Sequence, residues 1–289
     1  MTREPFGTRL HAATAARGPL CVGIDPHPGL LAAWDLPDDV AGLERFALTV
    51  VEALADRVAV LKPQAAFFER HGSRGVAVLE RVLADAASAG ALTIADAKRG
   101  DIGSTMAAYA DAFVGEGSPL AADAVTASPY LGFGSLAPLL DLAAKTGRGV
   151  FVLGLTSNPE GAAVQHAVGP DGRAVARAVL DGVRAANEPE IAAGRPLGSV
   201  GAVIGATVGA DAVRRLGLEL ADVHGPLLAP GIGAQGAGPQ ELRAVFGTSL
   251  AAVLASSSRE VLRGGPTVAG LRDAAGRTLD QVRAAVAPS

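Results

Sequence analysis

The stretch Ala91-Leu92-Thr93-Ile94-Ala95-Asp96-Ala97-Lys98-Arg99-Gly100-Asp101-Ile102-Gly103-Ser104-Thr105 places two carboxylates and a lysine where an apolar segment ends. Its first five residues have the composition of a buried strand, and alternate side chains of a strand point to the same side. We therefore expect Asp96 and Lys98 to face each other at the strand end. Gly100 lets the chain turn toward the second carboxylate, Asp101. Such a lysine is either paired for structure or held charged for chemistry.

Apolar runs of the same kind recur along the chain, each followed by a glycine, a proline or a charge and then by a segment with helical spacing. Runs that are apolar on both faces predict buried parallel strands, which need crossover segments such as helices between them. The runs are Leu20–Ile24, Val58–Leu61, Ala91–Ala95, Ala124–Thr126, Val150–Leu153, Val200–Ile204, Pro226–Ala229 and Leu250–Leu254.

The segments between these runs carry apolar residues at helical spacing. The stripe from Val40 to Leu54 follows Asp38-Asp39 as a candidate cap, and the stripe from Val76 to Ala86 ends before Gly90. Further helices are predicted at 136–144, 174–186, 211–216, 239–246 and 268–286. Eight strands alternating with about eight helices predict an α/β fold, a (β/α)8 TIM barrel in a single domain over residues 1–289. A doubly wound open sheet is the alternative.

The interval from Thr156 to Ser199 is longer than one crossover helix needs. It contains Ser157-Asn158-Pro159-Glu160-Gly161 and Asn187-Glu188-Pro189, two pieces rich in turn-forming residues that flank the helix predicted from Ala174. We expect residues 156–199 to form an inserted excursion on the rim of the barrel.

Composition limits the class of protein. The formal charge of −4 and a pI near 5.8 indicate neither a nucleic-acid nor an anionic-membrane partner. Cys21 is the single cysteine, so an intrachain disulfide and a thiolate metal cluster are both excluded. No apolar run approaches a signal peptide or the ~20 residues of a membrane span, which predicts a cytoplasmic protein.

Polar residues gather where the predicted strands end, and in a TIM barrel the active site lies at that end. Any one of them alone could be a capping or turn residue. They are Asp25, Lys62, Asp96, Lys98, Ser157, Gly231-Ile232-Gly233-Ala234-Gln235-Gly236 and Ser256-Ser257-Ser258-Arg259. Gly231 and Gly233 expose backbone N–H groups, and Gln235 adds a side-chain donor. Arg259 offers a planar guanidinium group that can donate two hydrogen bonds. Together these donors predict a phosphate site. A glycine turn beside a surface arginine is the alternative.

These motifs resemble the orotidine 5′-monophosphate decarboxylase family, and its longer bacterial branch in particular, from Val22 to Arg259. Residues 96–105 match the family pattern D-x-K-x-x-D-I-G-x-T, and residues 230–236 are similar to its phosphate loop P-G-[IV]-G-A-Q-G. The order of Asp25, Lys62 and Ser157-x-Pro159 agrees as well. Ser258 stands where the family often has a glycine before the arginine.

The resemblance implies a role for each site residue. Lys62, Asp96, Lys98 and Asp101 would form a catalytic network of alternating charge. A homodimer is implied, in which Asp101 and Thr105 reach into the partner's site. The substrate-binding residues would be Asp25, Lys62, Asp101 and Thr105 at the ribose, Ser157 at the pyrimidine amide edge, and Gly231, Gly233, Gln235 and Arg259 at the phosphate.

The implied reaction converts orotidine 5′-monophosphate to UMP and CO2, the last step of de novo UMP biosynthesis, with no metal and no cofactor. Loss of CO2 leaves an electron pair on C6 that the ring cannot delocalise, so an adjacent ammonium both stabilises it and donates the proton. Lys98 is the candidate for both roles.

Two other functions remain open from the sequence. A Mg2+-dependent phosphosugar enzyme, such as a hexulose-phosphate synthase or a keto-gulonate-phosphate decarboxylase, shares the D-x-K-x-x-D element. Such an enzyme is expected to carry an acidic metal ligand after the second strand, where this chain has Lys62-Pro63. A catalytically silent nucleotide-binding protein is the other possibility, and two lysines and two aspartates kept together argue against it.

Overall fold

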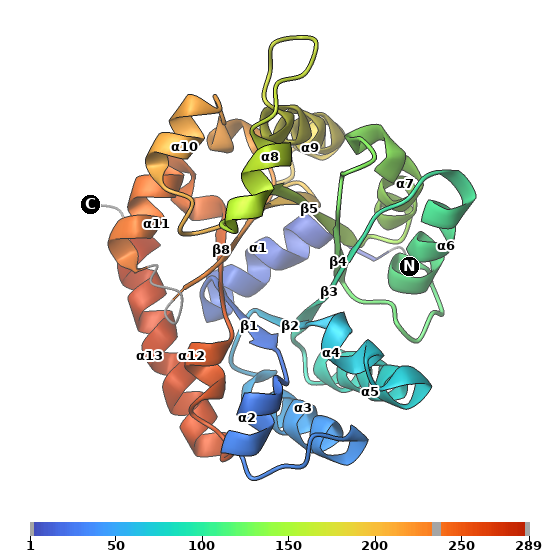
Figure 1. The fold of residues 1–289 in the computed structure, drawn as a ribbon, viewed down its shortest axis with the longest axis vertical. Helices are drawn as coiled ribbons and strands as arrows, with labels where there is room; N and C mark the ends of the chain where they lie inside the picture. The colour runs from blue at the N-terminus through green and yellow to red at the C-terminus, as the bar shows by residue number, and fades with distance from the viewer. Residues whose placement is uncertain (1–2, 233–237, 287–289) are drawn as a thin grey trace.

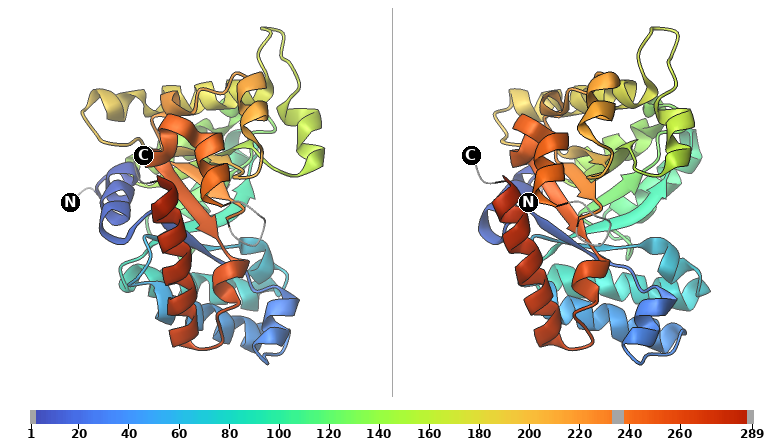
Figure 2. Two further views of the ribbon diagram at one scale, coloured as in Figure 1. Left: turned by 90° about the vertical axis from the view of Figure 1, so that its left-hand side faces the viewer. Right: turned by 60° about the vertical axis from the view of Figure 1, so that its left-hand side comes forward.

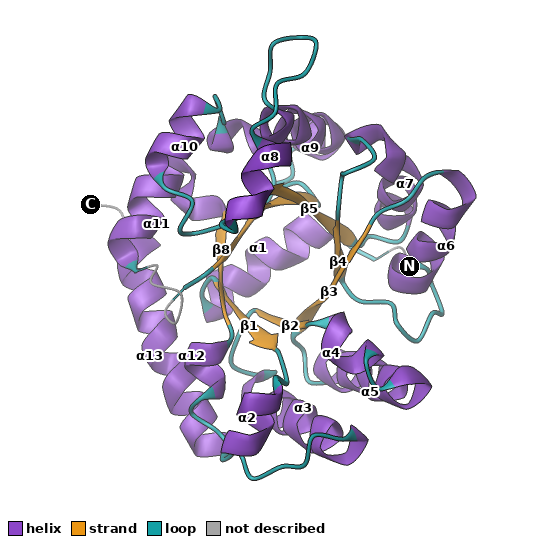
Figure 3. Ribbon diagram, in the orientation of Figure 1, coloured by secondary structure: helices purple, strands orange, loops and turns teal. Residues whose placement is uncertain are grey.

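The structure is a computed structural model that describes residues 3–232 and 238–286. Its eight strands are parallel and close into a barrel in chain order, because β8 pairs back onto β1 with Leu20 opposite Ala255. The predicted TIM barrel is therefore confirmed, and Figure 3 shows the strands as an inner ring. The strands are β1 (Leu20–Ile24), β2 (Val60–Pro63), β3 (Leu92–Arg99), β4 (Ala124–Ala127), β5 (Gly149–Leu155), β6 (Val200–Ile204), β7 (Leu227–Pro230) and β8 (Val253–Ser257).

Helices surround this ring (Figure 1) and pack apolar faces against it. The α-helices are α1 (Phe6–Arg17), α2 (Pro28–Ala33), α3 (Val40–Leu54), α4 (Ala65–Glu69), α5 (Gly72–Ser88), α6 (Gly103–Val114), α7 (Ala137–Lys145), α8 (Ala162–Gln165), α9 (Val175–Ala192), α10 (Ala210–Arg215), α11 (Pro239–Phe246), α12 (Arg259–Leu262) and α13 (Val268–Val286). Short 3-10 helices are η1 (Phe133–Leu136), η2 (Pro159–Gly161), η3 (Leu220–Val223) and η4 (Gly247–Ala252). No helix within the described ranges is both long and apolar enough to cross a membrane.

The predicted cap of α3 is confirmed, whereas the ends of several predicted elements differ from the structure. Asp39 caps α3 by accepting from the backbone N–H of Gly42 at 2.9 Å. The last strand begins at Val253 and not at Leu250, because residues 247–252 form η4. Residues 187–189, predicted as a turn, lie inside α9.

Asn187 explains why that turn prediction failed. Its side chain is fully buried, donates to the carbonyls of Val200 at 2.8 Å and Val223 at 2.9 Å, and accepts from the Val200 N–H at 3.0 Å. A residue common in turns is used here to join α9 to the start of β6, and the helix continues past it.

Helix α1 closes the amino-terminal end of the barrel. Figure 1 shows it behind the ring of strands, and Figure 2 places it at the opposite end of the molecule from α8. Phe6 and Leu10 pack with the inward-facing Cys21, Ile94 and Phe151, and the Phe6 and Phe151 rings meet edge to face at 5.9 Å. The barrel interior is therefore filled from below, and open space is left at the other end.

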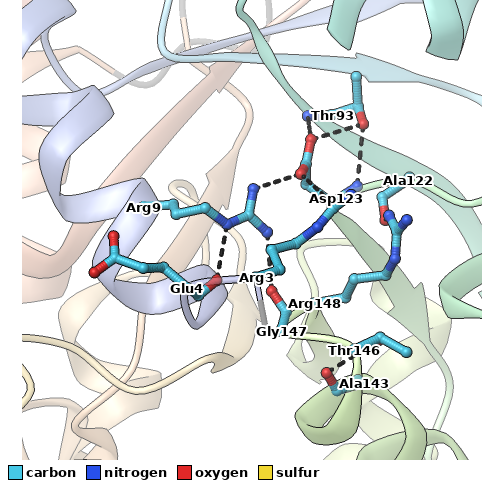
Figure 4. A network of polar contacts seen from close by, with 10 residues as sticks. All are labelled: Arg3, Glu4, Arg9, Thr93, Ala122, Asp123, Ala143, Thr146, Gly147 and Arg148. Atoms are coloured by element: carbon cyan, nitrogen blue, oxygen red, sulfur yellow. Dashed lines mark hydrogen bonds and ion pairs between the residues drawn. The ribbon is translucent and has the colours of Figure 1, made fainter. Parts of the chain in front are cut away.

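A charged cluster joins α1 to the amino-terminal end of the barrel, which we call the floor (Figure 4). Asp123 accepts from Arg9 at 2.5 Å and from Arg3 at 3.2 Å, and its other oxygen accepts from the backbone N–H and the hydroxyl of Thr93. Arg9 also donates to the Gly147 carbonyl at 2.9 Å. This buried carboxylate, just before β4, is satisfied by Arg3, by Arg9 of α1 and by Thr93 of β3, so its role here is structural.

The segment between β5 and α9 contains η2, α8 and a hairpin closed by the bridge between Val168 and Ala174. The hairpin projects beyond the ring of helices (Figures 1 and 2). The Val175 N–H donates to the Ala167 carbonyl at 2.8 Å, so α8 is joined to the first turn of α9.

Candidate active site

A cavity of about 1120 Å³ opens at the carboxyl ends of the strands. Six of the residues predicted from the sequence line it together: Asp25, Lys62, Asp96, Lys98, Gly231 and Arg259. They come from the ends of β1, β2, β3, β7 and β8, so the closed barrel brings distant parts of the chain to one opening.

Asp96 is held between the two lysines. Lys62 Nζ lies 2.5 Å from Asp96 Oδ2, and Lys98 Nζ lies 2.6 Å from Asp96 Oδ1. The side chains of Lys62 and Asp96 are each 7% exposed, whereas that of Lys98 is 44% exposed. The inner pair is therefore buried, and the outer ammonium is the one that a ligand in the cavity can reach.

Burial and pairing act in opposite directions on the inner pair. Burial alone lowers the pKa of Lys62, but the nearby charges of Asp96 and Asp25 outweigh it and raise that pKa above its ordinary value. Burial alone raises the pKa of Asp96, and the charges of Lys62 and Lys98 outweigh it and lower that pKa. Both groups are therefore ionised at neutral pH.

The backbone at Lys98 departs from a regular strand. Lys98 has φ +49°, in the left-handed region that residues with a side chain seldom adopt, and the pairing of β3 with β4 shifts register between Ala95 and Arg99. Its N–H donates to Thr126 Oγ1 at 2.9 Å. Asp96 and Lys98 do face each other as predicted, but a distorted strand end brings them together and simple alternation does not.

Two neutral residues complete the network, and the sequence reasoning missed both. Thr126 donates to Asp96 Oδ1 at 2.9 Å. Gln64 donates to the Asp96 carbonyl at 3.2 Å and accepts from Lys98 Nζ at 3.4 Å. Gln64 lies two positions beyond Lys62, and Thr126 lies at the end of β4, so the search of strand ends that found the charged residues could have included them.

Asp25 lines the cavity and, in the part of the chain that the structure describes, has one carboxylate oxygen without a partner. Its Oδ1 is buried and, among the residues that the structure describes, has no hydrogen-bond partner. A buried carboxylate oxygen left unpaired is costly, and a hydroxyl donor on a ligand would satisfy it.

The predicted phosphate site is described in part. Gly231 has φ +106°, which favours glycine, and lines the cavity together with Ile232, Ser258 and Arg259. Gly233 and Gln235 lie outside the described residues. Arg263, which the sequence reasoning did not single out, lines the same opening one helical turn after Arg259.

Three predicted residues lie outside the lining of this cavity. Asp101 accepts from the N–H of Ile102 at 2.8 Å, and Thr105 is exposed on the first turn of α6. Ser157 is exposed in the turn after β5, while its neighbours Thr156 and Asn158 line the cavity.

Two aromatic side chains also lie at the opening of the cavity. His27 lines the cavity and packs edge to face on Phe67, with ring centroids 4.3 Å apart. Tyr130 lies at the rim and is 76% exposed. Within residues 3–232 and 238–286, no three His, Cys, Asp or Glu side chains are grouped to hold a metal ion.

Comparison with known proteins adds independent information. Proteins named orotidine 5′-phosphate decarboxylase from Salinispora tropica and Streptomyces coelicolor are 63% and 61% identical over 286 residues, which is 99% of this chain and 100% of each relative. A crystal structure of a provisionally named orotidine 5′-phosphate decarboxylase from Streptomyces avermitilis has 60% identity and a TM-score of 0.94, covering 100% of this chain and 98% of that one. The Leishmania donovani OMP decarboxylase structure has 30% identity and a TM-score of 0.75, covering 99% and 100%.

The sequence profile of one family matches residues 18–272, which span the whole barrel from β1 to β8 and every cavity residue named above. The matched residues include Lys62, Asp96 and Lys98, and relatives of this identity and coverage point to the same family. The chain belongs to the Orotidine 5′-phosphate decarboxylase / HUMPS family.

Proposed function

We propose that this protein is a carboxy-lyase that converts orotidine 5′-monophosphate to UMP and CO2 in pyrimidine biosynthesis. The observation that carries the proposal is the accessible Lys98 ammonium, held 2.6 Å from Asp96 at the mouth of the barrel. Relatives that are 61–63% identical over their full length carry the name of this activity.

The chemistry needs a fixed cation beside C6 of the substrate ring. When the bond between C6 and the carboxyl carbon breaks, CO2 leaves and the electron pair stays on C6. Lys98 stabilises that charge and then transfers a proton from Nζ to C6, after which solvent reprotonates the amine. Asp96 and Thr126 hold Lys98 through its side chain and its backbone, so the ammonium is positioned before the reaction begins.

Asp96 contributes a second effect. Its carboxylate lies next to the position that the substrate carboxylate takes if C6 is to meet Lys98. Two like charges repel each other there, and the repulsion ends as CO2 departs. Lys62 keeps Asp96 ionised throughout, because its own charge is buried against that carboxylate.

Other cavity residues are assigned to binding. Asp25, with its unpaired buried oxygen, and Lys62 take the ribose hydroxyls. Gly231 and Arg259 take the phosphate, and Gly233 and Gln235 are proposed to contribute to the same binding. Ser157 is proposed to read the pyrimidine amide edge from the turn after β5. Binding energy gained at the phosphate, away from C6, holds the ring in place for the reaction.

We further propose a cytoplasmic homodimer in which Asp101 and Thr105 act in the partner's site. Ile102, the neighbour of Asp101 in the chain, is 60% exposed, and Tyr130 and Leu131 are 76% and 52% exposed, so apolar surface is available to a partner. A second copy of the chain would cover it.

The test is formation of UMP from orotidine 5′-monophosphate, followed by the loss of substrate absorbance and confirmed by chromatography, with a chelator present. Turnover that the chelator does not affect is the expected result. A strict requirement for Mg2+ together with turnover of a phosphosugar would assign the protein to the phosphosugar branch of the family. Tight binding of UMP without turnover would show a silent nucleotide-binding protein.

A further inference from the structure

The turn after β5 carries a hydrogen-bond chain that the proposed mechanism does not use. Gln165 Oε1 accepts from the Thr156 N–H at 2.9 Å, and Gln165 Nε2 donates to Thr156 Oγ1 at 2.7 Å. The Thr156 hydroxyl donates to Asn158 Oδ1 at 2.7 Å, and Asn158 Nδ2 donates to Glu160 Oε2 at 3.1 Å. The donors therefore all point the same way along four side chains, from Gln165 through Thr156 and Asn158 to Glu160.

The direction of this chain is set from both of its ends. A backbone N–H can only donate, so the Gln165 oxygen must face Thr156 and its NH2 group must face the hydroxyl. An ionised carboxylate can only accept, so the Asn158 NH2 group must face Glu160 and its oxygen must face Thr156. The pKa of Glu160 is lowered by hydrogen bonds from its own backbone and from Asn158, which keeps it in the accepting form. The two amides are therefore fixed in orientation, and the hydroxyl between them is consistent with both.

This chain lies at the cavity and is connected to α9 through α8. Thr156, Asn158 and Gln165 all line the cavity. Gln165 ends α8, which the hairpin joins to the long helix α9, with the Val175 N–H bonded to the Ala167 carbonyl. Figure 1 shows α8 beside α9 at the rim of the barrel.

The backbone around the turn is shaped to admit this pair of side chains. A Cβ at Gly161 would lie 3.0 Å from Thr156 Oγ1 and 3.1 Å from Gln165 Nε2, so glycine leaves the space in which they meet. The Leu155 carbonyl accepts from the Gly205 N–H at 2.8 Å, which holds the base of the turn against the end of β6.

We propose that Gln165 is a positioning residue that orients the Asn158 amide, through Thr156, to read the pyrimidine edge of the nucleotide. The inference rests on the proposed function and extends base recognition from Ser157 to its neighbour. Asn158 keeps a second N–H and a second oxygen lone pair free of the chain. These match a uracil-type edge, with a carbonyl at C4 and an N–H at N3, and they mismatch a cytosine edge, where donor and acceptor are exchanged.

The sharpest test is Gln165→Glu, which keeps the shape of the side chain and removes its donor. The Thr156 hydroxyl then turns to donate to the new carboxylate, so Asn158 Oδ1 loses its partner and only the bond from its NH2 group to Glu160 still restrains the amide. The probes are UMP, CMP and ribose 5-phosphate, the last of which has no base. Dissociation constants are measured by calorimetry on the full-length protein, and Gln281→Glu on the exposed face of α13 is the matched control.

We expect Gln165→Glu to weaken UMP binding about tenfold and to bring the UMP and CMP affinities close together, with ribose 5-phosphate and the control unchanged. KM for orotidine 5′-monophosphate should rise more than kcat falls. A second variant, Asn158→Asp, presents only acceptors and should shift the preference toward CMP.

Three outcomes would overturn the inference. One is that both variants still discriminate between UMP and CMP as the wild-type protein does. Another is that affinity for ribose 5-phosphate falls as much as affinity for UMP, which would show a general disturbance of the site. In both cases a wild-type protein that still decarboxylates its substrate leaves the proposed function standing. A wild-type protein that neither turns over the substrate nor binds UMP would overturn both.

Discussion

The backbone N–H of Lys98 donates to the hydroxyl of Thr126 at 2.9 Å, and the same hydroxyl donates to Asp96. Lys98 occupies a left-handed backbone conformation, which costs roughly 1–3 kcal/mol outside glycine and persists only where neighbours enforce it. Thr126 therefore links the backbone of the proposed proton donor to the carboxylate that pairs with its side chain.

Thr126→Val should lower kcat about ten- to a hundredfold, because Lys98 loses the contact that holds its backbone while the ammonium remains. The unpaired N–H should also reduce the free energy of unfolding by about 1–3 kcal/mol. Steady-state kinetics and urea unfolding measure the two effects. Thr126→Ser keeps the hydroxyl and should stay near wild type. Equal losses in both variants would contradict the assigned role.

Lys98→Ala should reduce kcat by about a thousandfold or more, because the cation at C6 and the proton source are removed together. The fold should persist, since Lys98 is 44% exposed and Asp96 keeps its pair with Lys62. Circular dichroism checks the fold, and Lys145→Ala on the exposed face of α7 is the control. An active Lys98→Ala protein, prepared in a host that lacks its own decarboxylase, would refute the mechanism.

The buried pair predicts how stability depends on pH. Because the folded pKa of Asp96 lies below its ordinary value of 3.8, its contribution is complete above that pH and is lost as the pH falls through the folded pKa. Lys62, with a raised pKa, contributes fully below 10.5 and loses its contribution as the pH rises through its folded pKa. Asp96→Asn should therefore reduce the slope of the free energy of unfolding against pH, on the acid side, by up to about 1.4 kcal/mol per pH unit. Urea unfolding followed by the fluorescence of Trp34, the single tryptophan, measures the slope between pH 2.5 and 5. An unchanged slope would mean that Asp96 does not titrate as described.

Phe6→Ala should destabilise the barrel by about 3–5 kcal/mol, because it leaves a cavity beneath Phe151. KM should stay near wild type, since the floor lies at the end opposite the cavity. Urea unfolding and activity assays on the same preparation separate the two quantities. His11→Ala, on the exposed face of the same helix, should change stability by less than about 0.5 kcal/mol. Comparable losses from both variants would show that α1 does not fill the floor as described.

The strands and the charged site residues could be predicted because their signals are local. A buried parallel strand is apolar on both faces, and a charge at its end stands out against that background. Asp25, Lys62, Asp96 and Lys98 were found in this way, and the structure brings all four to one cavity. Helix α1 gave no such signal, because it buries only Phe6, Gly7 and Leu10.

Neutral polar residues were harder to interpret because their roles depend on distant partners. Thr126 and Gln64 meet Asp96 across 30 and 32 positions of sequence, and only the strand register brings them together. Asn187 was predicted as part of a turn, since nothing in its neighbourhood shows that it joins α9 to β6. The left-handed backbone at Lys98 likewise follows from the pairing of two strands, which a single segment does not encode.

The pairing of Leu20 with Ala255 has a consequence for how the protein is made. The first strand leaves the ribosome long before β8, the strand that seals its edge. Until then the nascent polypeptide holds an open, apolar sheet with two unpaired edges, a form prone to aggregation. Synthesis must therefore pass β8 before the barrel can close and bury its core, and a chain that stops anywhere before β8 becomes a substrate for chaperones or proteases.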